Sequence, residues 1–419
     1  FPHRFLVASA LLFPFVVRAT MGCAHSTAGV APAELALEVV ERTTSRHFHA
    51  RYTLREKLGR GALGSVYAVT ALGAKAPPAA VKVLDLRSAS DRDKGLDDPR
   101  VSLDSWRFET MQNEVRVMEH VLGGENICRL VDSFVHGCLG YIVVERCDAT
   151  LRVALLGVRD LHEESLRPFF RDMLSGLSFV HLRGVIHRDV KPDNFMCSGP
   201  GNKVKLCDFG LSRATSESAE MVSGVFGTPP FMSPEMLKGM PYGSKVDAWS
   251  FGVVAYVLCF GAFPYTPTDK SGHAMKAAIA SGRPSPSFRS ESGPVVSAGL
   301  TSWIRDLLHR DPEARTSCHE ALERCRARPP ATSRTSLRCC VFSAQRCGAF
   351  GDNVLATSAE VSTLDLRLHD LQRRDHRSTQ PSLKCPTFAK VPTDADRTTC
   401  SGNTAETFEP ETSDSNLSI

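Results

Sequence analysis

Short runs of apolar and β-branched residues open the central part of the chain and predict β-strands. Residues 52–57, 65–70 and 79–84 alternate or cluster such residues and are separated by Gly and Pro. Residues 127–134 and 141–144 have the same texture. The pattern therefore predicts five short strands in this part of the chain.

Helical spacing of apolar residues replaces this pattern in two places. Residues 108–122 carry apolar side chains three or four positions apart, which predicts one amphipathic helix among the strands. From residue 151 onward the pattern is mostly helical, including residues 166–183 and 246–259. Strands with a single helix, followed by a helical body, indicate an α+β fold.

Two regions depart from these patterns. Residues 88–105 are charged, contain Gly and Pro, and are expected to form a loop insertion. After residue 328, Ser, Thr, Arg and Pro dominate, which predicts a mostly disordered tail. The expected organisation is an apolar segment at 1–20, a linking segment at 21–51, a strand-rich lobe at 52–147, a helical lobe at 148–328 and the tail at 329–419.

The composition is that of an ordinary globular protein. Of 419 residues, 42% are hydrophobic and 23% are charged, and the net charge is +4. This mild, dispersed charge does not indicate a nucleic-acid partner. The 14 Cys lack the paired spacings of zinc sites, so reduced thiols are expected. No segment matches the calcium-binding loop of an EF-hand.

The first twenty residues allow two interpretations. Residues 5–17 are almost wholly apolar and lie between Arg4 and Arg18, a length that suits the core of a signal peptide and is too short to span a bilayer. This interpretation implies a secreted protein. The other, which we favour, is that translation starts at Met21 and that the upstream stretch is a gene-model extension.

The residues that follow Met21 support the second interpretation. Met21, Gly22 and Ser26 fit the M-G-x-x-x-[ST] pattern of N-myristoylation, and Cys23 is a candidate for palmitoylation. One myristoyl chain binds membranes only marginally, so two chains are needed for stable attachment. This pattern predicts a membrane surface as a partner and a location at the cytoplasmic face of a membrane.

A glycine-rich segment lies between the first two predicted strands. Residues 59–66 read Gly-Arg-Gly-Ala-Leu-Gly-Ser-Val, the G-x-G-x-x-G-x-V spacing that lets backbone N–H groups approach phosphates. Taken alone, this motif is weak, because glycine-rich hairpins between strands are common.

A lysine on the third predicted strand strengthens this interpretation. Lys82, in the sequence Ala-Val-Lys, can reach phosphates behind the glycine-rich segment but needs a carboxylate to hold it. The best candidate on the predicted helix is Glu114, at the edge of its apolar face, with Glu109 and Glu119 as alternatives. The alternative is that Glu114 is an ordinary solvated charge on the surface of the helix.

The strongest signal is the sequence His-Arg-Asp-Val-Lys-Pro-Asp-Asn at residues 187–194. In this H-R-D-x-x-x-x-N pattern, Asp189 can accept a proton from a substrate hydroxyl, and Lys191 can neutralise charge on a transferred phosphoryl group. Asn194 can supply an amide oxygen to Mg²⁺, and Asp208, in Asp-Phe-Gly, supplies the carboxylate. These motifs, in this order and with these gaps, do not arise by chance.

With these motifs the chain resembles the eukaryotic protein kinases over residues 52–328. Further family marks are Ser-Pro-Glu at residues 233–235, where the family has Ala-Pro-Glu, and Asp-Ala-Trp-Ser-Phe-Gly at residues 247–252. Arg315 resembles the family's late Arg, whose partner would be Glu235 in a structural ion pair. The resemblance implies a two-lobed α+β kinase fold that binds ATP with Mg²⁺.

The resemblance also implies where the nucleotide binds. Val144 would be the gatekeeper, the backbones of Glu145 and Cys147 would bond adenine, and Cys207 would line the pocket. The candidate nucleotide-binding residues are Leu58, Gly59, Arg60, Gly61, Ala62, Leu63, Gly64, Ser65, Val66, Ala80, Lys82, Val144, Glu145 and Cys147. A non-catalytic pseudokinase scaffold is the alternative, which the retained catalytic residues disfavour.

The type of substrate follows from smaller marks. Lys191 is typical of the Ser/Thr class, and Thr228 resembles the threonine that bonds the catalytic Asp and Lys, although an ordinary turn residue is the alternative. The motifs look most like those of the calcium/calmodulin-dependent group, including calcium-dependent protein kinases. Asp193 implies protein substrates with basic flanks. Arg188 implies activation by a phosphate on the segment from residue 208 to 235, with Thr215, Ser216, Ser218 and Ser223 as candidates.

Overall fold

The computed structural model describes most of the chain between residues 47 and 327. The described residues are 47–61, 64–73, 76–96, 98, 100–159, 161–215, 221–269, 271–288 and 296–327. The predictions for residues 1–46 and for the tail at 329–419 lie outside them, as do those for Ala62, Leu63, Ser216 and Ser218.

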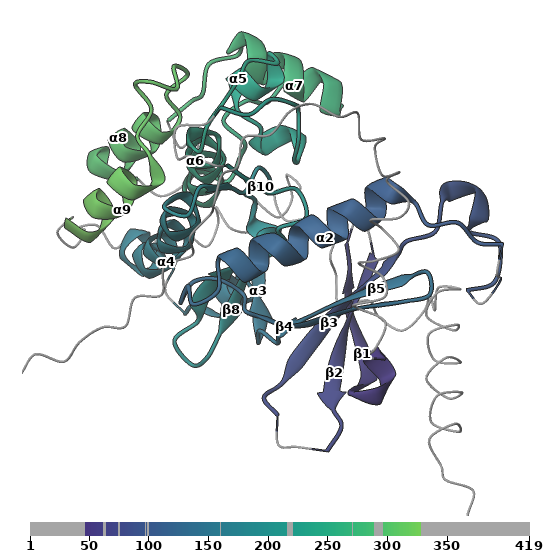
Figure 1. Cartoon of the computed structure of the whole chain (residues 1–419). Helices are drawn as coiled ribbons and strands as arrows, with labels where there is room; N and C mark the ends of the chain where they lie inside the picture. Colours follow the sequence, from purple (N-terminus) through teal and green to yellow (C-terminus); the bar gives the residue numbers. More distant parts are fainter. Residues whose placement is uncertain are drawn as a thin grey trace, which may run out of the picture. The chain divides into compact units, whose positions relative to one another are not determined.

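The five predicted strands form one antiparallel sheet in the strand-rich lobe (Figure 1). The order across the sheet is β1 (Tyr52–Arg60), β2 (Gly64–Ala71), β3 (Ala79–Asp85), β5 (Leu139–Glu145) and β4 (Leu130–His136). A short helix, η1 (Phe48–Ala50), precedes β1. Side chains alternate between the two faces of a strand, so Val81 and Val83 are fully buried in the core while Lys82 between them points to the other face.

The predicted helix among the strands is α2 (Ser105–His120), which contacts β4 and β5 (Figure 1). It begins three residues before the predicted start at residue 108, because the Asp104 side chain accepts a hydrogen bond from the backbone N–H of Arg107 at 3.1 Å. Its buried face carries Phe108 and Met111 together with one charged residue, Glu114. That charged residue is only 2% exposed and therefore needs a partner inside the protein.

The insertion at residues 88–105 is more ordered than the predicted loop. It contains η2 (Ala89–Asp91), and the buried Asp91 carboxylate accepts hydrogen bonds from the backbone and hydroxyl of Ser102 at 2.8 and 2.7 Å and from Lys94 at 2.6 Å. The insertion therefore folds back on itself before α2 begins.

The second lobe is mostly helical, as predicted. Its α-helices are α3 (Leu151–Gly157), α4 (Glu163–His181), α5 (Pro234–Leu237), α6 (Lys245–Phe260), α7 (Gly272–Ser281), α8 (Ala298–Leu307) and α9 (Cys318–Ala327). Its short strands are β6 (Ala149–Thr150), β7 (Val185–Ile186), β8 (Phe195–Ser198), β9 (Lys203–Leu206) and β10 (Arg213–Ala214), and its 3₁₀ turns are η3 (Pro192–Asn194) and η4 (Pro229–Phe231). Strand β8 pairs with β6 and β9, and β7 pairs with β10.

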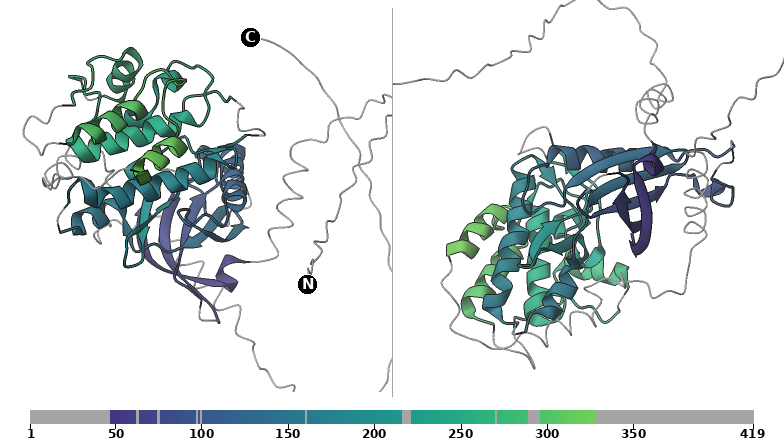
Figure 2. Two further views of the ribbon diagram at one scale, coloured as in Figure 1. Left: turned by 90° about the vertical axis from the view of Figure 1, so that its left-hand side faces the viewer. Right: turned by 90° about the horizontal axis from the view of Figure 1, so that it is seen from below.

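The helical lobe is built around α6. Nearly every residue of this helix is buried, and helices α4, α8 and α9 lie beside it, which both views of Figure 2 show. Phe170 of α4, Phe251 of α6 and Trp303 of α8 meet with ring centroids 5.7–5.9 Å apart. The predicted α+β class, with a strand-rich and a helical lobe, is confirmed. Among the described helices, none is long and apolar enough to cross a membrane.

The predicted ion pair between Glu235 and Arg315 is confirmed. The guanidinium donates to both carboxylate oxygens, at 2.6 and 3.0 Å, and the two residues are only 4% and 1% exposed. Arg315 also donates to the carbonyl of His309 at 2.8 Å and lies over the Trp249 ring. This pair joins α5 to the segment before α9 inside the helical lobe.

Removing one partner of this pair should destabilise the helical lobe strongly. Glu235→Ala leaves the Arg315 charge buried without its carboxylate, which costs about 3–5 kcal/mol in the free energy of unfolding. Urea unfolding of the full chain measures this loss. The matched control is Asp306→Ala, which breaks the surface pair with Arg324, whose side chains are 42% and 46% exposed, and should cost about 0–1 kcal/mol. Equal losses for the two variants would contradict the structural role of the buried pair.

Candidate active site

The ammonium group of Lys82 contacts two other predicted site residues. Its Nζ atom lies 2.9 Å from both carboxylate oxygens of Glu114 on α2 and 2.8 Å from Oδ1 of Asp208, which follows β9. Glu114, and not Glu109 or Glu119, is therefore the carboxylate that pairs with the lysine. One side chain of β3 thus contacts both α2 and the helical lobe.

The charged groups of this cluster shift one another's pKa values. Burial alone would lower the pKa of Lys82, but the carboxylates of Asp208 and Glu114 outweigh it and raise that pKa. Burial raises the pKa of Glu114, and Lys82 opposes this shift. Lys82 lowers the pKa of Asp208 to about 2, so this carboxylate is ionised at any pH above that value. The site therefore presents an ionised carboxylate to any bound cation.

The carboxylate of Asp189 is held by the residues predicted to act with it. Its Oδ2 accepts from Lys191 at 2.7 Å, and its Oδ1 accepts from the hydroxyl of Thr228 at 2.8 Å. Lys191 also donates to that hydroxyl at 3.0 Å. The amide nitrogen of Asn194 donates to the backbone carbonyl of Asp189 at 2.7 Å, which fixes the Asn194 side chain beside the same loop.

A residue to which the sequence assigned no role fixes the backbone of this loop. The carboxylate of Asp247, fully buried on α6, accepts from the backbone N–H groups of His187 and Arg188 at 2.8 and 2.9 Å and from the ring of His181 at 2.8 Å. Burial by itself would raise the pKa of Asp247, but these hydrogen bonds lower it. The motif at residues 247–252 marked this position by family resemblance alone.

Of the three described residues other than Gly that have a positive φ, two lie in this loop or beside it and the third is Asn202, in the turn between β8 and β9. Arg188 and Asp208 have φ angles of +67° and +62°, a left-handed conformation that residues other than Gly rarely adopt. Gly227, with φ +101°, lies so close to the loop that a Cβ there would be 2.4 Å from the carbonyl oxygen of Arg188. Only glycine fits beside Thr228 at this point.

A cavity of about 260 Å³ lies between the glycine-rich segment and these carboxylates. Among the predicted nucleotide-binding residues, those that line it are Leu58, Gly59, Arg60, Gly61, Val66, Ala80, Lys82, Val144, Glu145 and Cys147. Glu114, Asn194, Asp208 and Cys207 line it too, whereas Asp189, Lys191 and Thr228 are not among its lining residues. This size is close to the lower end of small-molecule sites.

The glycine-rich segment is a hairpin that also lines the cavity. Its backbone turns between β1 and β2, with the Gly61 N–H bonded to the Gly64 carbonyl at 2.8 Å. Gly64 and Ser65 do not line the cavity, and a Cβ on Gly64 would lie 2.0 Å from the carbonyl oxygen of Val83. At Gly64 the glycine is therefore required by the neighbouring strand.

Several lining residues were not predicted to line the cavity, although Asp193 among them was expected to favour basic substrates. They are Met118, Cys128, Ile142, Arg146, Thr150, Arg152, Pro192, Asp193 and Met196. The carboxylate of Glu145 accepts from Lys205 at 2.7 Å and from the Arg129 N–H at 2.8 Å, so its side chain is committed to those partners. Side chains such as Met118 and Ile142 read as ordinary core residues, and no local signal distinguishes them.

The donors available to a magnesium ion are one carboxylate and one amide. Asp208 and Asn194 line the same cavity, and the Asp208 side chain is 46% exposed. Within the described ranges, no group of three or more His, Cys, Asp or Glu side chains could hold a metal ion. A hard oxygen donor pair of this kind fits Mg²⁺ that shares its remaining ligands with phosphates and water.

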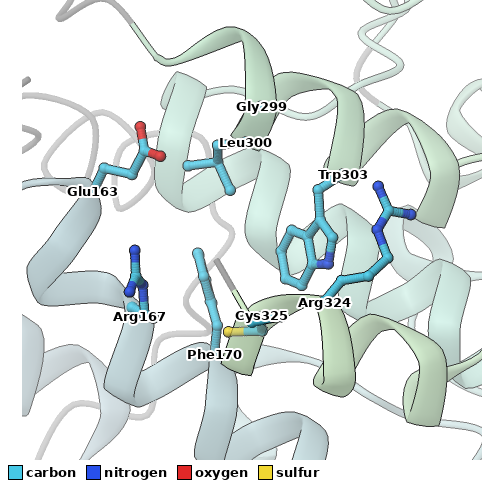
Figure 3. A pocket seen from close by; sticks show the side chains of 9 residues that line it. Glu163, Arg167, Phe170, Gly299, Leu300, Trp303, Arg324 and Cys325 are labelled. Carbon is cyan, nitrogen blue, oxygen red and sulfur yellow. The ribbon is translucent and has the colours of Figure 1, made fainter. Parts of the chain in front are cut away.

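A second cavity, of about 310 Å³, lies in the helical lobe between α4, α8 and α9. Figure 3 shows Phe170 and Trp303 at its centre, with Glu163, Arg167 and Arg324 around them. None of the predicted catalytic residues reaches it. The chemistry therefore belongs to the smaller cavity between the lobes.

Comparison with known proteins agrees with this geometry. Calcium/calmodulin-dependent serine/threonine-protein kinase 1 of rice is 32% identical over 286 residues, which cover 66% of this chain and 44% of the relative. Calcium/calmodulin-dependent protein kinase type 1 of Caenorhabditis elegans is 30% identical over 275 residues, 65% of this chain and 73% of the relative. Calcium-dependent protein kinase 4 of Arabidopsis thaliana is 29% identical and is covered over 51% of its length.

The chain thus spans less than half of the rice relative and about half of the Arabidopsis relative. The family model described as "Protein kinase domain" matches residues 52–325, which include both lobes and every residue of the site described above. The chain therefore belongs to the protein kinase family.

Proposed function

We propose that this chain is an active serine/threonine protein kinase, which transfers the γ-phosphate of ATP to Ser or Thr hydroxyls of protein substrates. The observation that carries the proposal is the position of Lys82, whose ammonium group contacts both Glu114 and Asp208. A kinase must bring these three groups together before it can hold a nucleotide for transfer. The serine/threonine kinases among the relatives support the same reaction.

The residues of this chain would divide the reaction among them. Asp189 would accept the proton of the substrate hydroxyl, and Thr228 and Lys191 hold its carboxylate in one orientation. Lys191 would also neutralise charge on the transferred phosphoryl group. Mg²⁺ bound by Asn194 and Asp208 would supply positive charge to the phosphates of the nucleotide.

The contact between Thr228 and Asp189 favours Ser and Thr as acceptors, as the sequence resemblance implies. Asp193 lines the cavity beside the catalytic loop, and its carboxylate would favour substrates with basic flanks. The alternative function is that of a non-catalytic scaffold, which would keep the fold and bind partners without transferring phosphate. Lys82, Asp189, Asn194 and Asp208 are all present and brought together, which favours the enzyme.

Substitution of the acidic residues tests the reaction directly. Asp189→Ala should lower kcat by about 10²–10⁴-fold, because the general base is lost. Asp208→Ala should abolish phosphate transfer, because the ionised metal-binding carboxylate is removed. Lys82→Met should reduce phosphate transfer strongly. Transfer of labelled phosphate to a Ser-containing peptide with basic flanks is the measurement.

Glu125→Ala is the matched control, since this side chain is 81% exposed and pairs with Lys203 at the surface. It should keep wild-type turnover, and a thermal melt of each variant separates lost chemistry from lost folding. Wild-type turnover in the Asp208→Ala variant would overturn the proposed mechanism, and a wild-type chain that binds ATP without transferring phosphate would favour the scaffold.

The activation segment offers two described candidates for regulatory phosphorylation. The hydroxyl of Thr215 donates to the Gly184 carbonyl at 2.8 Å, whereas Ser223 is exposed. Arg188, which would contact the phosphate, donates to the Leu211 carbonyl at 2.7 Å and lies 4.1 Å from the centre of the Phe226 ring. We therefore favour Ser223, although Ser216 and Ser218 lie outside the described residues.

Phosphatase treatment of the purified chain should lower its activity, because Arg188 loses an anionic partner on the segment. Ser223→Ala should start at the lower activity and show no further loss, whereas Thr215→Ala should respond to the phosphatase as the wild type does. Peptide-kinase assays before and after treatment measure this. Unchanged activity of the treated wild type would show that the segment needs no phosphate.

The proposed cytoplasmic membrane location rests on the acylation pattern at Gly22 and Cys23, which lies outside the described residues. Translation from Met21 with a C-terminal fluorescent tag tests it. Gly22→Ala should release the protein from membranes, and Cys23→Ser should weaken attachment, because two chains are needed to hold a protein stably. If Gly22→Ala leaves attachment unchanged, the lipid anchor is wrong, and the apolar residues 5–17, with secretion, become the better explanation of targeting.

A further inference from the structure

Two cysteines line the nucleotide cavity where the chain passes from β5 into the helical lobe. Cys128, which precedes β4, and Cys147, which follows β5, both line the cavity. Cys128 is only 4% exposed, whereas Cys147 is half-buried. Both are free thiols, and they are hydrogen-bond partners of each other.

The strand pairing explains why residues 19 positions apart come together. The backbone N–H of Glu145 donates to the Arg129 carbonyl at 3.0 Å, which holds the end of β5 against the residues that enter β4. The thiol of Cys128 lies 3.8 Å from the carbonyl oxygen of Glu145. The two cysteines therefore lie on adjacent stretches of backbone, and a disulfide needs such proximity.

The two thiols are chemically unequal. The hydrogen bond with Cys128 lowers the pKa of the Cys147 thiol, a shift that burial, Glu145 and Asp148 oppose and Lys205 favours. The same hydrogen bond raises the pKa of Cys128, together with its burial. Cys147 is thus the less buried of the two thiols and the one whose pKa is lowered, and a lowered pKa with access is what selects a cysteine for oxidation.

We propose that Cys147 and Cys128 are a peroxide-oxidisable pair whose disulfide closes the adenine end of the nucleotide cavity. The Cys147 thiolate attacks one oxygen of hydrogen peroxide, the O–O bond breaks, and a sulfenic acid forms while hydroxide leaves and takes up a proton as water. The Cys128 thiol then attacks this sulfur, and a second water leaves as the S–S bond forms. Two thiols and one peroxide thereby give one disulfide and two waters, and a dithiol reductant reverses the step.

The expected consequence is regulation of nucleotide binding, a part of the inference that rests on the proposed kinase function. Both cysteines line the cavity, and the backbone of Cys147 is the predicted partner of adenine. A disulfide brings the two sulfur atoms to about 2 Å from each other, which draws this backbone toward Cys128. Bound nucleotide would cover the thiols and slow their oxidation.

The test uses the full reduced chain, treated with hydrogen peroxide in the presence or absence of a non-hydrolysable ATP analogue. After the free thiols are blocked, peptide mapping by mass spectrometry should find Cys128 joined to Cys147, with less of this product when the nucleotide is present. Binding of a fluorescent ATP analogue should be lost in step with the disulfide and return on reduction. A different dominant disulfide, or nucleotide binding that survives complete formation of this one, would overturn the inference.

Two variants sharpen the result. In Cys128→Ser, oxidation of Cys147 should stop at the sulfenic acid, which dimedone traps. Cys197→Ser is the matched control, because Cys197 is buried near Cys147 but forms no disulfide with it in this proposal. In this variant the peptide that joins Cys128 to Cys147 should form as in the wild type. Loss of the joined peptide in this control would mean that Cys197 resolves the oxidation and would overturn the assignment of Cys128.

The mapping needs no catalysis, so it separates this inference from the proposed function. A chain that transfers phosphate but never joins Cys128 to Cys147 contradicts the redox pair alone. A chain that forms the disulfide but transfers no phosphate when reduced contradicts the kinase proposal alone.

Discussion

The contact on which the site depends is the ammonium group of Lys82 between two carboxylates. Glu114 and Asp208 raise each other's cost of ionisation, and a shared cation lets both lie in one cavity. Glu114 belongs to α2, and Asp208 belongs to the helical lobe. The Lys82 side chain of β3 can therefore contact both carboxylates only when α2 and the helical lobe are both correctly placed. The sheet supplies the rigid base, since Val81 and Val83 on either side of Lys82 are fully buried.

A second buried charge performs the corresponding task for the catalytic loop. Asp247 lies in α6, a helix that is almost wholly buried, and its carboxylate accepts hydrogen bonds from the backbone N–H groups of His187 and Arg188. The left-handed φ of Arg188 is unfavourable alone, so the loop needs such external hydrogen bonds to keep its shape. Asp189 then presents its carboxylate from a backbone that is fixed before any substrate arrives.

The sequence predicted the strands and the residues that meet at Lys82 better than the local structure between them. Alternation located the five strands, and motif spacing identified Lys82, Glu114 and Asp208, which the structure brings together. The ordered insertion was missed because the contact of Asp91 with Ser102 joins residues 11 positions apart, which no local pattern reveals. The early start of α2 was missed for a related reason, since its capping residue lies inside that charged stretch. The contacts of Asp247 and of the cysteine pair span longer separations still.

The charged groups of the site connect the strand-rich lobe to the helical lobe. Asp208 is ionised down to a pH of about 2 and has nearly half of its side chain exposed, so it can serve a second cation while it contacts Lys82. Asp208 raises the pKa of Glu114, so a cation held by Asp208 would oppose that repulsion. At Glu145 the cavity wall also carries an ion pair, because this carboxylate contacts Lys205, and the free thiols of Cys128 and Cys147 line the cavity as well. One part of the cavity wall is therefore held by the charges of Lys82, Glu114 and Asp208, and another part carries two free thiols.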